Sequence, residues 1–263
     1  MGAGSLAPML KSLAGGALFG EVWGTGTPQV LVLHGWARTH SDFAAVVGPA
    51  SPDGPLPTLA PDLPGFGSTP APPSAWGAAD YAAALVPLLE GRPDGDRFPV
   101  VVLGHSRGGC IAVALAAARP DLVRALVLTG APLLPRPGPA RKPAAAFLLA
   151  RRLHRFGLLS DEAMERARRR HGSTDYRNAE GIMRDVFVRM VRERYDVELA
   201  ALTVPVSLVW GDDDADVPVE VARLAQSLVP GSSLTLCPGA GHLTPLTAPE
   251  ALRAAVAKAL DPS

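Results

Sequence analysis

The chain has 263 residues, 48% of them hydrophobic, with 25 basic and 25 acidic side chains. This length suits one α/β domain that carries an insertion, and no stretch is apolar for long enough to span a membrane. The balanced charge gives no reason to expect a nucleic-acid partner, and two cysteines are too few for a disulfide framework. The N-terminal residues make a poor secretion signal, so we expect a cytoplasmic location.

Short apolar runs predict the strands of the fold. After residues 18–26, which look like a strand and a turn, the runs lie at 30–33, 100–103, 125–128, 206–210 and 234–237. Segments of helical character alternate with them, at residues 80–89, 110–118, 219–228 and 249–260. This alternation predicts an α/β fold with a mostly parallel central sheet flanked by helices. Ligands of such sheets bind beyond the carboxyl ends of the strands.

One long segment, from about residue 132 to residue 197, interrupts the alternation. It begins with several prolines and continues with arginine-rich sequence of helical character, carrying 15 basic against 8 acidic side chains between residues 136 and 196. The rest of the chain has the compensating negative charge. We expect most of these arginines to form a solvated helical face. The alternative is that they attract an anionic substrate or partner.

The sequence Gly-His-Ser-Arg-Gly-Gly at residues 104–109 lies between a predicted strand and a predicted helix. A serine flanked at this turn by glycines two residues before and two residues after it is the pattern of a nucleophile elbow. Gly104 and Gly108 leave room for a sharp turn, which exposes the hydroxyl of Ser106. The alternative is an ordinary glycine-rich turn.

A serine hydroxyl needs a base to become a nucleophile, and that base is usually a histidine oriented by a carboxylate. Among the six histidines, His242 follows the last predicted strand in a glycine-rich loop, where it would reach the catalytic edge of the sheet. His105 adjoins Ser106 and should point in another direction. His34 ends an early strand, where we expect it to shape the following loop.

The acid of such a triad should lie between the serine and the histidine. Residues 210–218 read Trp-Gly-Asp-Asp-Asp-Ala-Asp-Val-Pro and offer four aspartates after a predicted strand. The spacing of three of them resembles the opening of a calcium loop, but Val217 and Arg223 stand where that loop needs glycine and glutamate. We therefore expect no metal. The residues by themselves do not choose among the aspartates.

Two backbone N–H groups should stabilise the oxyanion of the transition state. The N–H of Arg107, directly after the serine, is the first candidate. The second is the N–H of Trp36, because Gly35 lets the loop after the strand 30–33 turn inward. Trp36 could instead be a plain packing residue.

These segments together resemble the α/β-hydrolase fold superfamily, in its cap-bearing, esterase-like serine hydrolase branch. The matching motifs are Leu33-His34-Gly35-Trp36, Asp62-Leu63-Pro64-Gly65-Phe66-Gly67-Ser68, residues 104–109, Trp-Gly-x-x-Asp-x-x-Val-Pro at 210–218 and Gly239-Ala240-Gly241-His242. The resemblance implies that Asp214 is the acid and that Asp62 is structural. It also implies a helical cap at residues 132–197, inserted between the core parts 1–131 and 198–263.

The resemblance further implies a hydrolase that cleaves a carboxylic ester of a small acyl substrate through an acyl-enzyme, with no cofactor. Serine at the elbow argues against dehalogenase and epoxide hydrolase chemistry, for which the family uses aspartate. Acyl transfer, thioester or lactone hydrolysis, carbon–carbon bond hydrolysis and haloperoxidase-like activity use the same triad and stay open. A slow-turnover ligand receptor is a further alternative. Dinucleotide binding fits poorly, since no G-x-G-x-x-G follows a strand.

Overall fold

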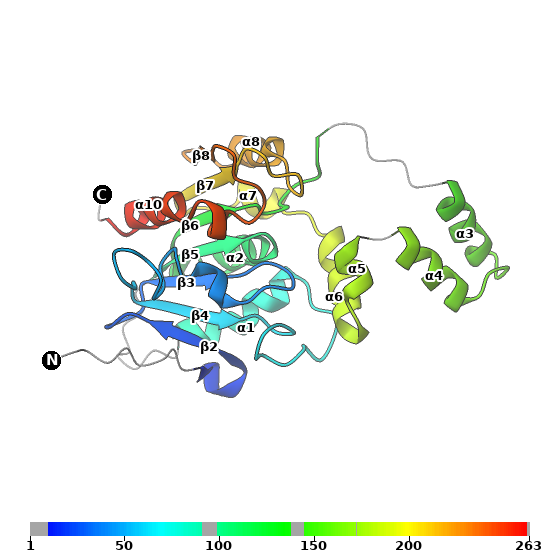
Figure 1. The fold of residues 1–263 in the computed structure, drawn as a ribbon, viewed down its shortest axis with the longest axis horizontal. Helices are drawn as coiled ribbons and strands as arrows, with labels where there is room; N and C mark the ends of the chain where they lie inside the picture. Colours follow the sequence, from blue (N-terminus) through cyan, green and yellow to red (C-terminus); the bar gives the residue numbers. More distant parts are fainter. Residues whose placement is uncertain (1–9, 91–98, 138–144, 172, 262–263) are drawn as a thin grey trace.

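The computed structural model describes residues 10–90, 99–137, 145–171 and 173–261 (Figure 1). Their centre is an eight-stranded sheet in the order β1-β2-β4-β3-β5-β6-β7-β8. The strands are β1 Lys11–Leu13, β2 Leu18–Trp23, β3 Val30–Leu33, β4 Thr58–Asp62, β5 Val100–His105, β6 Val123–Thr129, β7 Val206–Gly211 and β8 Ser233–Cys237. Only the pairings of β2 with β1 and with β4 are antiparallel. The mostly parallel sheet expected from the sequence is confirmed, and all the predicted apolar runs are strands.

Helices cover both faces of this sheet. The long ones outside the insertion are α1 Ala78–Glu90, α2 Arg107–Ala118, α8 Val219–Leu228 and α10 Pro249–Leu260. Along β5 the side chains alternate between two apolar clusters, with Val100 and Val102 in the cluster that contains α1 and α2. Val101 and Leu103 belong to the other cluster, which contains α10. A strand segment buried on both sides is apolar at every position, which explains why residues 100–103 of β5 form an unbroken apolar run.

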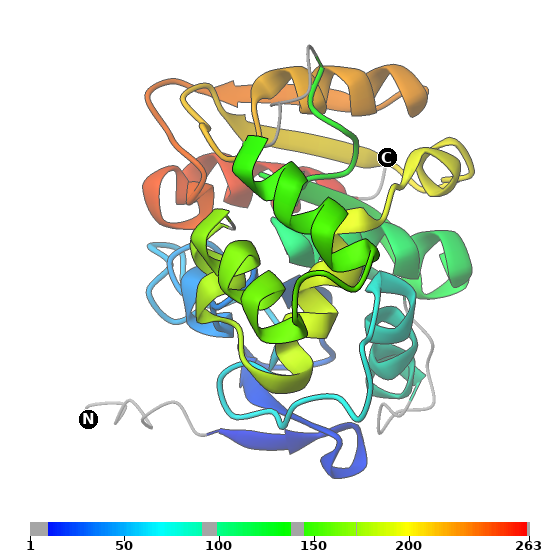
Figure 2. The ribbon, with the colours of Figure 1, turned by 90° about the vertical axis from the view of Figure 1, so that its right-hand side faces the viewer.

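In the described residues between β6 and β7, where the sequence departs from the strand–helix alternation, there are five helices. They are α3 Ala145–Arg155, α4 Asp161–His171, α5 Thr174–Asn178, α6 Gly181–Arg192 and α7 Asp196–Ala200. Figures 1 and 2 show α5 and α6 beside one end of the sheet, with α3 and α4 farther out. Val186 and Met190 on α6 and Leu199 on α7 are buried in the same apolar cluster as α2. The later helices of the insertion are therefore continuous with the core.

The register of the parallel strands brings the loops of interest to one edge. Leu33 at the end of β3 pairs with Gly104 near the end of β5. Gly211 at the end of β7 pairs with Cys237 at the end of β8. The loops that leave these four strands therefore start at the same edge of the sheet, the side on which the inserted helices lie (Figure 1). Among the described helices, none combines the length and the apolar character that crossing a bilayer requires.

Candidate active site

Ser106 occupies a strained turn between β5 and α2. Its backbone has φ 52° and ψ −121°, a conformation that non-glycine residues rarely adopt and that costs on the order of 1–3 kcal/mol. The turn also explains the flanking glycines. A Cβ on Gly104 would lie 2.6 Å from the Cα of Gly109, and one on Gly108 would collide with the carbonyl group of Leu33. The predicted elbow therefore has the geometry that its sequence indicates.

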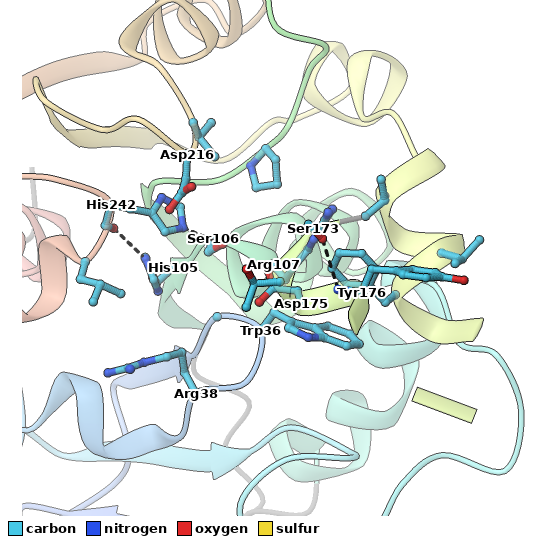
Figure 3. A pocket seen from close by; sticks show the side chains of 18 of the residues that line it. Trp36, Arg38, His105, Ser106, Arg107, Ser173, Asp175, Tyr176, Asp216 and His242 are labelled. Atoms are coloured by element: carbon cyan, nitrogen blue, oxygen red, sulfur yellow. Dashed lines mark hydrogen bonds between the residues drawn. The ribbon is translucent and has the colours of Figure 1, made fainter. Parts of the chain in front are cut away.

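The structure brings Ser106, His242 and Asp214 into one chain of hydrogen bonds (Figure 3 shows the serine and the histidine). The Oγ of Ser106 is 3.1 Å from Nε2 of His242, and Nδ1 of His242 is 2.9 Å from Oδ2 of Asp214. The carboxylate also accepts hydrogen bonds from the backbone N–H groups of Asp216 and Val217, at 2.9 and 2.7 Å. A carboxylate only accepts, so Nδ1 of the imidazole carries the proton and Nε2 is free to accept from the serine.

Asp214 differs from the three other aspartates of the loop after β7 in its burial. Asp214 is 4% exposed, whereas Asp212, Asp213 and Asp216 are all exposed. The loop is held in place by the indole of the buried Trp210, which donates to the carbonyl of Val217 at 2.8 Å. The sequence motif implied this choice of aspartate, while the residue types alone left it open.

His34 orients the loop that contains the expected oxyanion donor. Its Nε2 accepts a hydrogen bond from the N–H of Leu63 at 2.8 Å, so the proton is on Nδ1, which donates to the carbonyl of Gly35 at 2.8 Å. Burial lowers the pKa of His34 to about 4 and keeps the ring neutral. Because C=O and N–H of a trans peptide point in opposite directions, this bond directs the N–H of Trp36 away from His34.

Both expected oxyanion donors lie close to the serine. A Cβ on Gly35 would be 3.2 Å from the Cβ of Ser106, so the loop after β3 runs directly past the elbow. Trp36 and Arg107 both line the cavity beside Ser106. As the first residue of α2, Arg107 has a backbone N–H with no carbonyl partner inside the helix. Each of these two positions can thus present an N–H group to a ligand.

His105 is positioned to support the loop that carries His242. Its ring Nε2 donates to the backbone carbonyl of His242 at 2.9 Å. Burial, aided by the neighbouring imidazole of His242, lowers the pKa of His105 to about 4. The ring is therefore a neutral donor. The sequence indicated only that His105 points away from the serine, and nothing in the pattern of residues pointed to this support.

A cavity of about 900 Å³ opens beside the serine. Ser106, His242 and Trp36 line it from the sheet side, and Tyr176 and Phe187 line it from α5 and α6 (Figure 3). The rings of Trp36 and Phe187 are in contact, with centroids 5.0 Å apart. The inserted helices therefore complete the wall of the cavity, which gives a small molecule an apolar surface next to the hydroxyl.

The charged groups in the cavity wall are of both signs, and two of its three arginines, Arg38 and Arg107, have protein partners. Arg38 makes two hydrogen bonds to the carboxylate of Asp42, at 2.6 and 2.7 Å. The guanidinium of Arg107 donates to the carbonyl of Met190 at 3.0 Å. Asp175 also lines the cavity. The expectation that the substrate is anionic therefore stays a prediction.

Asp62 lies at the end of β4 and takes part in a separate set of contacts. Its carboxylate accepts from Nδ1 of His40 at 2.7 Å and from the N–H of Ser68 at 3.0 Å. These bonds hold the loop of residues 62–68 in place, and none of them involves the serine or its histidine. Asp62 was expected to be structural, and its contacts fit that expectation.

Comparison with known proteins identifies the family. The sequence profile of the alpha/beta hydrolase family matches residues 30–255. The chain belongs to this family. It is 44% identical over 106 residues to Lipase LipV of Mycobacterium tuberculosis, covering 40% of this chain and only 37% of that protein. A pimeloyl-[acyl-carrier protein] methyl ester esterase of Aromatoleum aromaticum is 31% identical, over 85% of this chain and 94% of its own length.

Solved structures show the same fold at low sequence identity. The serine hydrolase of carbazole degradation, the CarC enzyme, superposes with a TM-score of 0.69 and is 23% identical. The superposition covers 97% of this chain and 99% of that one. A likeness of this kind supports the α/β-hydrolase fold of the chain.

Proposed function

We propose that the protein is a serine hydrolase that cleaves a carboxylic ester of a small molecule through an acyl-enzyme. The observation that supports this most is the hydrogen-bonded chain from Ser106 through His242 to Asp214, at an elbow that faces a cavity. The relatives named lipase and methyl ester esterase act, by their names, on bonds of this class.

In the first half of the reaction, Ser106 Oγ attacks the ester carbonyl while Nε2 of His242 takes the hydroxyl proton. Asp214 holds the imidazole in the required tautomer and stabilises the imidazolium. The N–H groups of Trp36 and Arg107 donate to the oxyanion of the tetrahedral intermediate. Losing one such donor typically costs on the order of 3 kcal/mol of transition-state stabilisation.

Collapse of this intermediate breaks the bond to the alcohol, whose oxygen takes the proton from His242. Water then enters, gives a proton to Nε2 of His242 and attacks the acyl carbonyl. The second tetrahedral intermediate expels Ser106 Oγ, which recovers its proton from the imidazole. The carboxylic acid leaves and the site returns to its starting state. The Ser106–His242 and His242–Asp214 hydrogen bonds are already formed in the resting site, so activation of the serine needs little reorganisation.

The inserted helices serve as a cap over this site. This assigns residues 132–197 to the cap, and residues 1–131 and 198–263 to the two parts of the hydrolase core. Support comes from α5 and α6, whose side chains Tyr176 and Phe187 line the cavity opposite the serine. The cap would determine how long an acyl chain the site accepts.

A panel of nitrophenyl esters from acetate to palmitate tests this proposal. We expect turnover by the native chain, with the best chain length reporting the depth of the cavity. Ser106→Ala should lower kcat on the order of 10⁶-fold. Ser173→Ala is the matched control, because Ser173 lines the same cavity and its hydroxyl only caps α5. Equal activity of the Ser106→Ala variant and the native chain would refute the proposal.

A further inference from the structure

Helices α3 and α4, with the turn between them, form a projecting hairpin that we call the outer hairpin (residues 145–171). In Figure 1 the outer hairpin lies beyond α5 and α6, and Figure 2 shows it in front of the sheet edge. It is attached through α4, where Glu165 accepts from Tyr176 at 2.9 Å and pairs with Arg184 at 3.1 Å. Met164 is 1% exposed at this attachment.

The outer hairpin exposes an unusual amount of apolar surface. Ten large apolar side chains are exposed in the described part of the chain. Four of them lie inside the outer hairpin, in the eleven-residue stretch 148–158: Leu148, Leu149, Phe156 and Leu158. Phe156 is 62% exposed and Leu158 is 72% exposed. Single exposed apolar residues are common, but a cluster of this kind marks an interaction surface.

The same surface is basic. Residues 145–171 contain seven arginines and three acidic residues. Two of the acids are already engaged, Asp161 by His154 at 2.7 Å and Glu165 by Arg184. Arg151, Arg152 and Arg155 on α3 are all exposed. The outer hairpin therefore presents positive charge together with apolar side chains.

Helical geometry mixes the two kinds of side chain. Leu148 and Arg152 are four residues apart, and Leu149 and Arg152 are three apart, so they are neighbours on one face of α3. The guanidinium of Arg155 lies over the ring of Phe156, 5.1 Å from its centre. An arginine-rich helix that also exposes large apolar side chains is typical of a segment that lies in the interface of an anionic membrane.

We propose that the outer hairpin docks the protein on an anionic phospholipid surface. Leu148, Leu149, Phe156 and Leu158 would enter the boundary between headgroups and acyl chains, while the arginines pair with anionic headgroups. Charge decides between this occupant and a second copy of the chain. A symmetric contact would bring the same basic patch against itself, and like charges facing each other oppose association. An anionic lipid surface supplies the opposite charge.

Co-sedimentation of the full chain with phospholipid vesicles tests this docking without any readout of catalysis. We expect binding to vesicles of phosphatidylcholine with one quarter phosphatidylglycerol, much weaker binding to phosphatidylcholine alone, and loss of binding as salt screens the charges. Arg151→Gln with Arg152→Gln should lower the partition coefficient about 25-fold, which is about 5-fold for each arginine. Phe156→Ser with Leu158→Ser should lower it at least about tenfold.

The matched control is Arg223→Gln with Leu224→Ser on α8, which removes one exposed arginine and one exposed leucine outside the insertion. It should bind vesicles like the native chain, and circular dichroism should show that all variants are folded. Absence of binding by the native chain, or equal binding by the hairpin and control variants, would overturn the proposal. A dimer in solution that Phe156→Ser with Leu158→Ser abolishes would also overturn it, and would assign the surface to self-association.

Discussion

Replacing Asp214 by asparagine should change the tautomer of His242 while it keeps the hydrogen bonds that hold the loop after β7. Oδ1 of Asp214 accepts the N–H groups of Asp216 and Val217, and the oxygen of an asparagine amide can keep both bonds. The amide nitrogen then takes the place of Oδ2, which is 2.9 Å from Nδ1 of His242. Two donors would face each other there, and Oδ1, which is 3.1 Å from Nδ1, already accepts the two backbone N–H groups, so we expect the imidazole to move its proton to Nε2. In that tautomer it cannot accept the proton of Ser106.

The expected effect is large on catalysis and small on stability. A wrong tautomer of this kind lowers kcat about 10⁴-fold, which corresponds to roughly 5.5 kcal/mol in the activation free energy. The two backbone N–H groups keep an acceptor but lose its charge, so we expect the free energy of unfolding to fall by only about 1 kcal/mol. The site would remain folded and largely inactive.

The assay is kcat and kcat/KM on a short nitrophenyl ester, together with urea unfolding of each variant. Asp213→Asn is the matched control, since Asp213 is the preceding residue in the same loop and is exposed. It should change kcat by less than about threefold, a difference of roughly 0.6 kcal/mol in activation free energy. A severe loss in Asp213→Asn with a mild one in Asp214→Asn would refute this reasoning and transfer the role of the acid to Asp213.

Two further predictions concern the elbow and the buried histidines. Gly108→Ala should remove most activity and lower Tm, because the new Cβ would collide with the carbonyl of Leu33. Gly241→Ala is the control and should have a small effect, because a Cβ on Gly241 would meet no atom within 4 Å. Equal kcat/KM values for the two variants would contradict this prediction. His34 and His105 have pKa values lowered by burial to about 4, below the value of 6.5 in the unfolded chain. Between these two pH values the unfolded chain binds more protons than the folded chain. The free energy of unfolding should therefore fall by about 1.4 kcal/mol per pH unit for each histidine as the pH falls from 6.5 to 4. Urea unfolding of His105→Gln across this pH range should show about half of the decrease in unfolding free energy that the two histidines cause together. A pH dependence equal to that of the native chain would contradict the lowered pKa of His105.

The central strands and helices could be predicted because a two-sided parallel sheet leaves a strong pattern. β3 and residues 100–103 of β5 are apolar at every position, and a glycine or proline lies within two residues of each end of these runs. β1 and β4 were not predicted. β1 has only three residues, and β4 contains Pro61 and ends in the buried Asp62, so neither resembles an apolar run.

The residues of the candidate site differ in how far they could be predicted from the sequence. Ser106 and His242 could be chosen from local sequence, because strand ends and glycines indicate where a turn delivers a side chain. Asp214 needed the family motif, since four aspartates share one loop and only burial in the fold distinguishes them. The support given by His105 depends on a contact across 137 residues of sequence, which no local pattern contains.

The central claim is that Ser106 is a nucleophile activated by His242, and labelling with a fluorophosphonate tests it most directly. Intact-mass analysis followed by peptide mapping should find one adduct per chain, on Ser106. The adduct should be absent in Ser106→Ala and form much more slowly in His242→Ala. A stoichiometric adduct on another residue, or labelling of Ser106→Ala at the native rate, would contradict the account.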